Sequence, residues 1–298
     1  MSAVRTESES GEIVWRWKGE TVTVGLERRG SGRSILLLPA MSSISTRAEM
    51  HGLQARLSER FATIAVDWPG FGDRPRARFD WRPEHYRDFI RFVSETVVPR
   101  PYATVAAGHG AGYALAQAAA VPGSLGRLCL VAPTWRGPLP TMAGKRLPVF
   151  GKIARAGDTP VLGSLLYRLN VNRPVVRMMA RGHVYADPHW LDAARTASKM
   201  ALTRAAGARH ASLRFVTGEL DPFDSRETFL ACARTVEDPV LVLYGEGTPP
   251  KSRSEMDALA ALPNVEGAVL PAGKLAIHEE FPDAAAGAIL RFLSERTS

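Results

Sequence analysis

The sequence predicts an α/β protein with a mostly parallel sheet and helices on both faces of it. Short apolar runs that suit buried strands alternate with longer segments whose apolar residues recur at helical spacing. The first two strand-like runs alternate apolar and polar residues around Gly19, as an antiparallel hairpin does. A length of 298 residues with 45% hydrophobic content is enough to bury one large core. We therefore expect one α/β domain that carries an insertion.

Each element is predicted from its own pattern of apolar residues and turn residues. Strands are expected at 12–18, 20–28, 34–38, 61–66, 102–108, 125–132, 239–244 and 265–270. Helices are expected at 47–60, 82–98, 113–120, 225–233, 252–262 and 282–295. Residues 136–210 lack strand-like alternation and place apolar residues and arginines at helical spacing. The predicted organisation is an α/β core at 12–135 and 211–298, interrupted by a helical segment at 136–210.

Composition and charge narrow the classes of function. The net charge is +8, but the basic residues are spread along the chain, and there is no basic block or zinc-binding spacing. We expect no nucleic-acid partner, while a basic surface or pocket that attracts anionic ligands stays open, especially at 136–210. Two cysteines are too few for a disulfide framework or a metal site. The polar first eleven residues and the lack of a long apolar stretch predict a cytoplasmic protein without membrane insertion.

Residues 102–112 form the most informative stretch. Small and β-branched residues lead into Gly108-His109-Gly110-Ala111-Gly112, and a helix of small residues follows at once. This pattern predicts a buried strand, a sharp turn and a helix. It resembles the nucleophile elbow of the α/β-hydrolase superfamily, Gly-x-Ser-x-Gly, with Gly110 in the place of the serine. The glycine spacing does not match a dinucleotide-binding fingerprint, so we expect no cofactor.

A second motif carries the same resemblance. Residues 67–72, Asp-Trp-Pro-Gly-Phe-Gly, match the Asp-x-Pro-Gly-x-Gly turn that α/β-hydrolases commonly carry after an early strand. The segment 136–210 stands where members of this superfamily insert a helical cap over the pocket. The chain is therefore similar to the capped, AB hydrolase-1 type. The resemblance covers nearly the whole chain and implies an α/β-hydrolase fold.

The resemblance also implies a set of catalytic positions, and the side chains depart from all three of them. The nucleophile position holds Gly110, which adopts a strained turn without a Cβ penalty. The acid position after strand 239–244 holds Thr248, with Glu246 two residues earlier, and the alternative acid position holds Thr134. The histidine position falls on Lys274 or Leu275. The nearest histidine is His278, which either reaches the pocket as a base or packs at the start of the last helix.

The remaining candidates are groups that would bind a substrate. The resemblance places the two oxyanion-binding N–H groups at Ala111 and near Met41 or Ser42, where the Ser42 side chain either contacts a ligand or caps a helix. For His109, packing beneath the turn is favoured over a catalytic role. Trp135 and Tyr185 are expected to line the pocket, the latter within a cluster at 181–190 whose spacing fits no metal site.

Three functions compete on this evidence. In the leading interpretation, the protein is an enzyme that acts on a small, largely apolar carbonyl compound without a covalent serine intermediate. It would be a lyase, isomerase, cyclase or direct-water hydrolase that uses the oxyanion hole and His278 as base. Nearly level with it is a non-catalytic binder of a small apolar ligand or of a protein partner. The third is a conventional ester or C–C bond hydrolase with relocated residues. The oligomeric state has no signature in the sequence.

Overall fold

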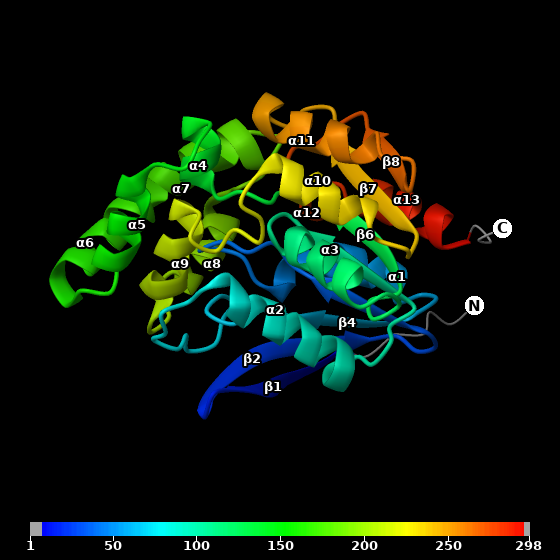
Figure 1. Ribbon diagram of the computed structural model, residues 1–298, viewed down its shortest axis with the longest axis horizontal. Coiled ribbons are helices and arrows are strands. Elements are labelled where there is room, and N and C mark those ends of the chain that lie inside the picture. Colours follow the sequence, from blue (N-terminus) through cyan, green and yellow to red (C-terminus); the bar gives the residue numbers. More distant parts are fainter. Residues whose placement is uncertain (1–7, 295–298) are drawn as a thin grey trace.

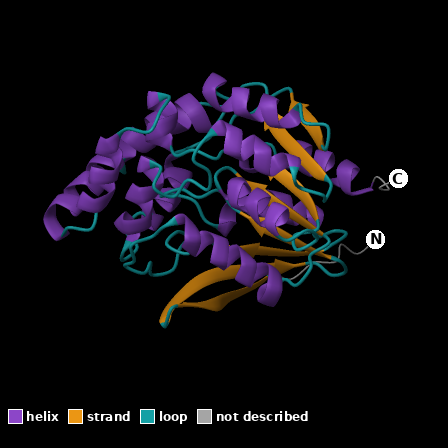
Figure 2. Cartoon of the chain, viewed as in Figure 1, coloured by secondary structure: helices purple, strands orange, loops and turns teal. Residues whose placement is uncertain are grey.

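A computed structural model describes residues 8–294, and its centre is one eight-stranded sheet (Figures 1 and 2). The strand order is β1-β2-β4-β3-β5-β6-β7-β8, and every pair is parallel except β1 with β2 and β2 with β4. The strands are β1 (Glu9–Trp17), β2 (Glu20–Arg29), β3 (Ser34–Leu38), β4 (Ala62–Val66), β5 (Ala103–Ala107), β6 (Arg127–Val131), β7 (Val240–Gly245) and β8 (Val265–Leu270). The predicted fold class is confirmed.

Helices cover both faces of the sheet because the central strands are apolar on both faces. In β3, Ile35 and Leu37 belong to one core cluster, and Leu36 and Leu38 belong to the other. The first cluster is closed by α1 (His51–Leu57) and α13 (Pro282–Ser294). The second is closed by α2 (Pro83–Phe92), α3 (Gly110–Ala120), α10 (Arg226–Arg234) and α11 (Pro250–Ala260).

A few boundaries differ from the expected ones. The helix expected at 47–60 begins with a 3-10 turn, η1 (Arg47–Met50), and the one at 82–98 ends in a wider turn, η2 (Val93–Val97). A short helix, α12 (Ile277–Glu280), was not expected. Residue 295, the expected last residue of the final helix, lies outside the described residues, as do residues 1–7 of the polar start.

Between β6 and β7 the chain builds a group of helices beyond the ends of the strands (Figure 1). They are α4 (Pro138–Ala143), α5 (Pro148–Ala156), α6 (Pro160–Asn170), α7 (Arg173–Met179), η3 (Ala180–Val184), α8 (Ala193–Leu202) and α9 (Ala208–Thr217). We call residues 136–210 the helical insert. The helix α9 runs on from it and contacts α4, α5 and α6.

A buried ion cluster fixes the loops at the carboxyl ends of β3 and β4. The guanidinium of Arg47 donates to Asp67 at 2.5 Å and to Asp73 at 2.8 Å, and the Arg47 N–H also donates to Asp67. A Cβ on Gly72 would lie 2.6 Å from the Asp67 carboxyl, so only glycine fits this turn. The motif at 67–72 is therefore an anchor for the loops around the site.

Candidate functional site

The sharp turn between β5 and α3 is centred on Gly108. This residue has a φ of +53°, in the left-handed region, and its N–H donates to the Val131 carbonyl at 2.9 Å. The Thr134 N–H in turn donates to the Gly108 carbonyl at 2.9 Å. Gly110 is the first residue of α3 and does not have a positive φ. The left-handed residue of the turn is thus two positions earlier than the sequence motif indicated.

Gly110 has another reason to be glycine. A Cβ there would lie 2.9 Å from both the Pro39 carbonyl oxygen and the Trp68 indole nitrogen. That nitrogen donates a buried hydrogen bond to the same carbonyl at 2.9 Å. Gly110 therefore allows the start of α3 to pack closely against a buried tryptophan.

The N–H expected from Ala111 is already used. It donates to the Gly108 carbonyl at 3.2 Å, as the first bond of the turn into α3. The residue after the left-handed turn residue is His109, and within residues 8–294 its backbone N–H has no hydrogen-bond partner. His109, rather than Ala111, is the residue whose N–H is placed for an oxyanion.

The His109 side chain is packed beneath the turn. Its Nε2 donates to the Leu220 carbonyl at 2.8 Å, and the Tyr113 hydroxyl donates to the same oxygen. Burial lowers the pKa of His109 to about 4, so the ring is neutral near pH 7. The Asp221 carboxylate lies 3.7 Å from Nε2 and accepts bonds from the Gly137 N–H and from Arg146. This arrangement is structural, because the ring is held by a carbonyl below the turn.

His278 is not placed as a base. It lies on α12 with only 2% of its surface exposed, and neither ring nitrogen has a hydrogen-bond partner among the described residues. Burial lowers its pKa to about 4, with the nearby Glu279 carboxylate acting to raise the pKa and the Lys199 ammonium acting to lower it. It is not among the residues that line the cavity described below. The first role expected for His278 therefore has no geometric support.

The backbone N–H groups of Met41 and Ser42, expected to include the second oxyanion donor, have no hydrogen-bond partner among residues 8–294. The Met41 side chain is fully buried in the core. The Ser42 hydroxyl shares a 2.7 Å hydrogen bond with Ser45 and accepts from the Ile44 N–H at 3.3 Å. Ser42 does not cap the following helix, because the N-cap of η1 is Thr46, whose side chain accepts from the Ala48 N–H. The Ser42 hydroxyl is held in a local turn instead.

A buried ion network joins the helical insert to the core. The Lys199 ammonium on α8 lies 3.0 Å from Glu49 of η1 and 3.0 Å from Glu279 of α12. The Tyr185 hydroxyl donates to Glu279 at 2.8 Å, and its ring stacks on Trp190 with centroids 4.1 Å apart. Burial raises the pKa of Glu49 to about 7. Tyr185 therefore belongs to this network and does not line the cavity.

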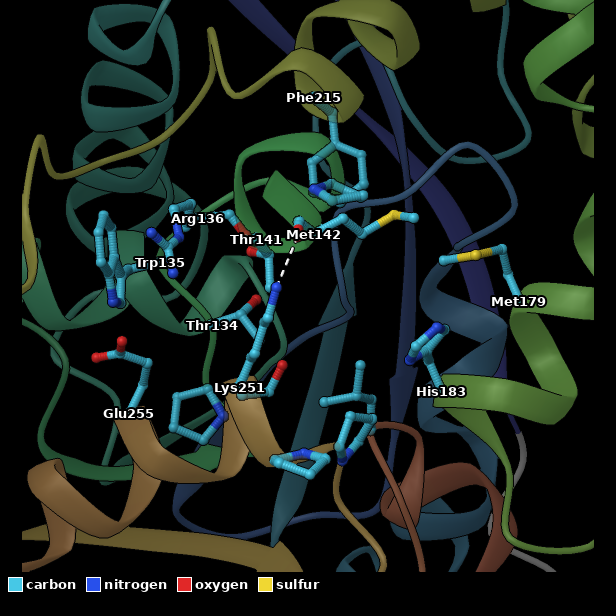
Figure 3. A pocket seen from close by; sticks show the side chains of 16 residues that line it. Thr134, Trp135, Arg136, Thr141, Met142, Met179, His183, Phe215, Lys251 and Glu255 are labelled. Carbon is cyan, nitrogen blue, oxygen red and sulfur yellow. Dashed lines mark hydrogen bonds between the residues drawn. The ribbon is translucent and has the colours of Figure 1, made fainter. Parts of the chain in front are cut away.

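A cavity of about 570 Å³ lies at the carboxyl ends of β6 and β7, between the core and the helical insert (Figure 3). Its lining is mostly apolar and includes Trp135, Met142, Met179, Phe215 and Leu275. The volume is in the range of small-molecule sites. Trp135 thus lies where the sequence analysis placed it, on the cavity wall.

The charged groups of the cavity wall are unequal. Arg136 and Lys251 line it, and the one carboxylate in the lining, Glu255, lies 3.1 Å from the guanidinium of Arg226. The Lys251 ammonium donates to the Met142 carbonyl at 2.6 Å, which connects α11 to α4 (Figure 3). The wall therefore presents positive charge that Glu255 does not balance.

Comparisons with known proteins agree with this architecture. The profile of the Alpha/beta hydrolase family matches residues 35–288. The chain belongs to the alpha/beta hydrolase family. No curated protein sequence matches it.

Several solved structures of alpha/beta hydrolases are similar to this one in fold. A thermophilic esterase from Thermogutta terrifontis has a TM-score of 0.72 and 17% identity, over 96% of this chain and 98% of that one. The Cif epoxide hydrolase from Acinetobacter nosocomialis gives 0.71 and 14%, over 95% and 89%. A variant of the haloalkane dehalogenase DatA from Agrobacterium tumefaciens C58 gives 0.71 and 16%, over 96% and 97%. At these identities the similarity concerns the fold.

The residues expected at the catalytic positions of an alpha/beta hydrolase lie in different surroundings. The sharp turn, where the nucleophile of this family sits, is Gly108. Of the two residues at the histidine position, Leu275 lines the cavity, and the Lys274 ammonium donates to the Arg181 carbonyl at 2.7 Å. Thr248, at the acid position, is buried without a side-chain partner among residues 8–294, and Glu246 is exposed.

Metal and membrane-spanning features can be checked over the same residues. Within 8–294, no group of three or more His, Cys, Asp and Glu side chains is placed to hold a metal ion. No helix in this part of the chain is long and apolar enough to span a bilayer.

The sequence carried no signal for the Lys199 network, because Lys199 and Glu49 are 150 residues apart.

Proposed function

We propose that the protein binds a small, largely apolar molecule with an anionic group in the cavity at the ends of β6 and β7, without forming a covalent intermediate. The helical insert covers this ligand as a cap. The proposal modifies the leading interpretation from the sequence, which relied on His278 as a base. It develops the binding alternative instead.

One observation carries the proposal. No histidine in residues 8–294 forms a hydrogen bond with a serine or threonine hydroxyl or with a cysteine thiol. Nucleophilic catalysis requires a nucleophile next to a base that takes its proton. The large apolar cavity is nevertheless present, so the scaffold supports binding but not the usual covalent chemistry.

The ligand class is inferred from the cavity wall. Apolar side chains favour an apolar body, because burying such a body removes it from water. Arg136 and Lys251 favour a carboxylate or a similar anion, since the single wall carboxylate is already paired with Arg226. An amphipathic carboxylic acid fits both features.

A second candidate is non-covalent proton transfer on the bound molecule. His183 is the histidine that lines the cavity, and it lies on η3 opposite the core wall. In this case a His183→Ala variant would keep ligand affinity but lose turnover. A variant that loses affinity to the same degree would identify His183 as a binding residue only.

Calorimetric titration with decanoate and with 1-decanol tests the binding proposal. Ser252 lines the cavity from α11, while Ser254 of the same helix is exposed and outside the lining. We expect Ser252→Trp to fill part of the cavity and to weaken decanoate binding by at least about tenfold, which corresponds to roughly 1.4 kcal/mol. Ser254→Trp is the matched control and should bind like the wild type. Decanol should bind more weakly than decanoate in the wild type.

Equal affinities for the two tryptophan variants would contradict the location of the site. Equal affinities for decanoate and decanol would contradict the anionic part of the ligand class. Both results are read from the same titrations, so the two claims fail separately.

A further inference from the structure

The positive charge of the chain is concentrated in the helical insert. Residues 136–210 contain 13 of the 38 lysines and arginines but only 3 of the 30 aspartates and glutamates. The insert therefore has a net charge of +10, and the remaining sequence has a net charge of −2. One part of the molecule thus accounts for the whole basic character of the protein.

The helix α6 presents an apolar face to solvent within this basic insert. Val161 is 82% exposed, and Leu162, Leu165 and Leu169 are also exposed. These four positions fall on one side of the helix, because residues three, four and seven apart share a face. The opposite side includes Gly163, where a Cβ would lie 2.2 Å from the Gly157 carbonyl, so α6 packs closely through its other face.

This apolar face is at one end of the molecule. Figure 1 shows α6 at the tip of the insert, at the far end of the long axis from the two chain termini. About half or more of each of the four side chains stays exposed, from 48% for Leu162 to 82% for Val161. These side chains are therefore open to contact with another molecule.

The insert exposes one cation on the apolar face of α6 and several more on the helices before and after it in the chain. Arg168 is exposed on the same side of α6, between Leu165 and Leu169. The adjacent helix α5 exposes Lys152 and Arg155. The next helix in the chain, α7, exposes two cations, Arg173 and Arg177, and the apolar side chain of Met178. Apolar side chains flanked by Arg and Lys are the composition of helices that lie in a lipid–water interface.

We propose that the apolar face of α6, together with the positive charge of the helical insert, docks the protein on the surface of an anionic lipid bilayer. The apolar face would enter the headgroup region, and the arginines would pair with lipid phosphates. A second copy of the chain fits less well, because a contact between two inserts would bring together two segments of +10. A nucleic acid would leave the four apolar side chains without a partner. This inference does not depend on the ligand proposed above.

Vesicle co-sedimentation with the full-length protein tests the docking. One set of vesicles is phosphatidylcholine alone, and the other is phosphatidylcholine with about 30% phosphatidylglycerol, an anionic lipid. We expect binding to the anionic vesicles only. Binding should be at least about tenfold weaker in about 0.5 M salt, because this ionic strength screens the attraction. Leu165→Glu should lower the partition coefficient by at least about tenfold, since it removes an inserting side chain and adds a repelled charge.

Val121→Glu is the matched control. Val121 is an exposed apolar residue of the core, at the end of α3, and the same substitution there makes the same change in charge. We expect its partition coefficient to stay within about twofold of the wild type. Both positions are on the surface, so thermal unfolding should confirm that both variants are folded.

Three results would overturn the inference. The first is wild-type protein that stays in the supernatant with anionic vesicles at low salt. The second is an equal loss of binding in Leu165→Glu and Val121→Glu. The third is a wild-type dimer in sedimentation velocity that Leu165→Glu converts to a monomer, which would identify the face as an interface between copies.

Discussion

Replacing each of the two candidate turn glycines by serine gives the sharpest prediction about the vacated nucleophile. Gly108→Ser and Gly110→Ser both restore a Ser in the glycine-rich motif. In the structure, only Gly108 has the left-handed turn conformation, and Gly110 opens α3 against Trp68. The two substitutions should therefore differ in stability, and neither should restore a covalent hydrolase.

The expected costs follow from the surroundings of each Cβ. At Gly108 a side chain adopts a left-handed φ, which costs about 1–2 kcal/mol, and its Cβ lies 3.1 Å from the Ala40 methyl group. At Gly110 the Cβ lies 2.9 Å from two atoms of a buried hydrogen bond. Overpacking costs about 1–3 kcal/mol, and leaving the Trp68 N–H unpaired costs about as much again. We expect about 1–2 kcal/mol for Gly108→Ser and about 2–6 kcal/mol for Gly110→Ser.

Chemical denaturation and an ester assay measure the two parts of this prediction. Each variant is unfolded in urea and incubated with a p-nitrophenyl ester, and a burst of product and acylated protein are sought by mass spectrometry. We expect no burst in either, because the His109 ring is held below the turn by the Leu220 carbonyl and His278 is buried away from the cavity, so neither is placed to take the proton. A burst from Gly110→Ser would refute the assignment of the turn to Gly108. A greater loss of stability at Gly108 than at Gly110 would refute the packing argument.

Two further predictions concern the buried ionisable groups. Lys199→Met should destabilise the protein by about 3–5 kcal/mol at pH 8, because it leaves Glu49 and Glu279 without their cation. The loss should be smaller at pH 5, which is below the raised pKa of Glu49, about 7, so that this carboxyl is neutral. Exposed Lys152→Met is the control, and an equal loss at both pH values would contradict the network. The pKa of His278 is lowered to about 4 from an ordinary 6.5, so its contribution to stability is complete above pH 6.5 and is lost as the pH falls toward 4. Between pH 6.5 and pH 4, the free energy of unfolding of the wild type, measured in urea, should therefore fall by about 3 kcal/mol more than that of His278→Phe. Equal falls in the two proteins would contradict a buried, neutral ring.

The fold could be predicted from the sequence because its signals are local. The runs at 34–38 and 265–270 coincide with β3 and β8, since apolar residues bounded by turn residues define a strand within a few positions. The helix α12 was not predicted because four residues are too few to show a helical period. It also follows a left-handed turn at Gly273, which the pattern of apolar residues does not indicate.

The site was less predictable, for reasons that lie in tertiary packing. Three alternating glycines give the turn motif two registers, and only the backbone conformation distinguishes Gly108 from Gly110. Trp135 was placed correctly on the cavity wall because it follows a core strand, where ligands collect in open α/β sheets. The contact of the Tyr185 hydroxyl with Glu279 could not be predicted, because the two residues are 94 positions apart in the chain.

A crystal structure of the protein with decanoate tests the central claim most directly. The account predicts density for an intact, non-covalent ligand between α4, α9 and the ends of β6 and β7. Its apolar chain should lie against Trp135 and Leu275, and its carboxylate should lie within hydrogen-bond distance of Arg136 or Lys251. Density continuous with a protein side chain, or a ligand bound outside this cavity while the cavity stays filled with solvent, would contradict it.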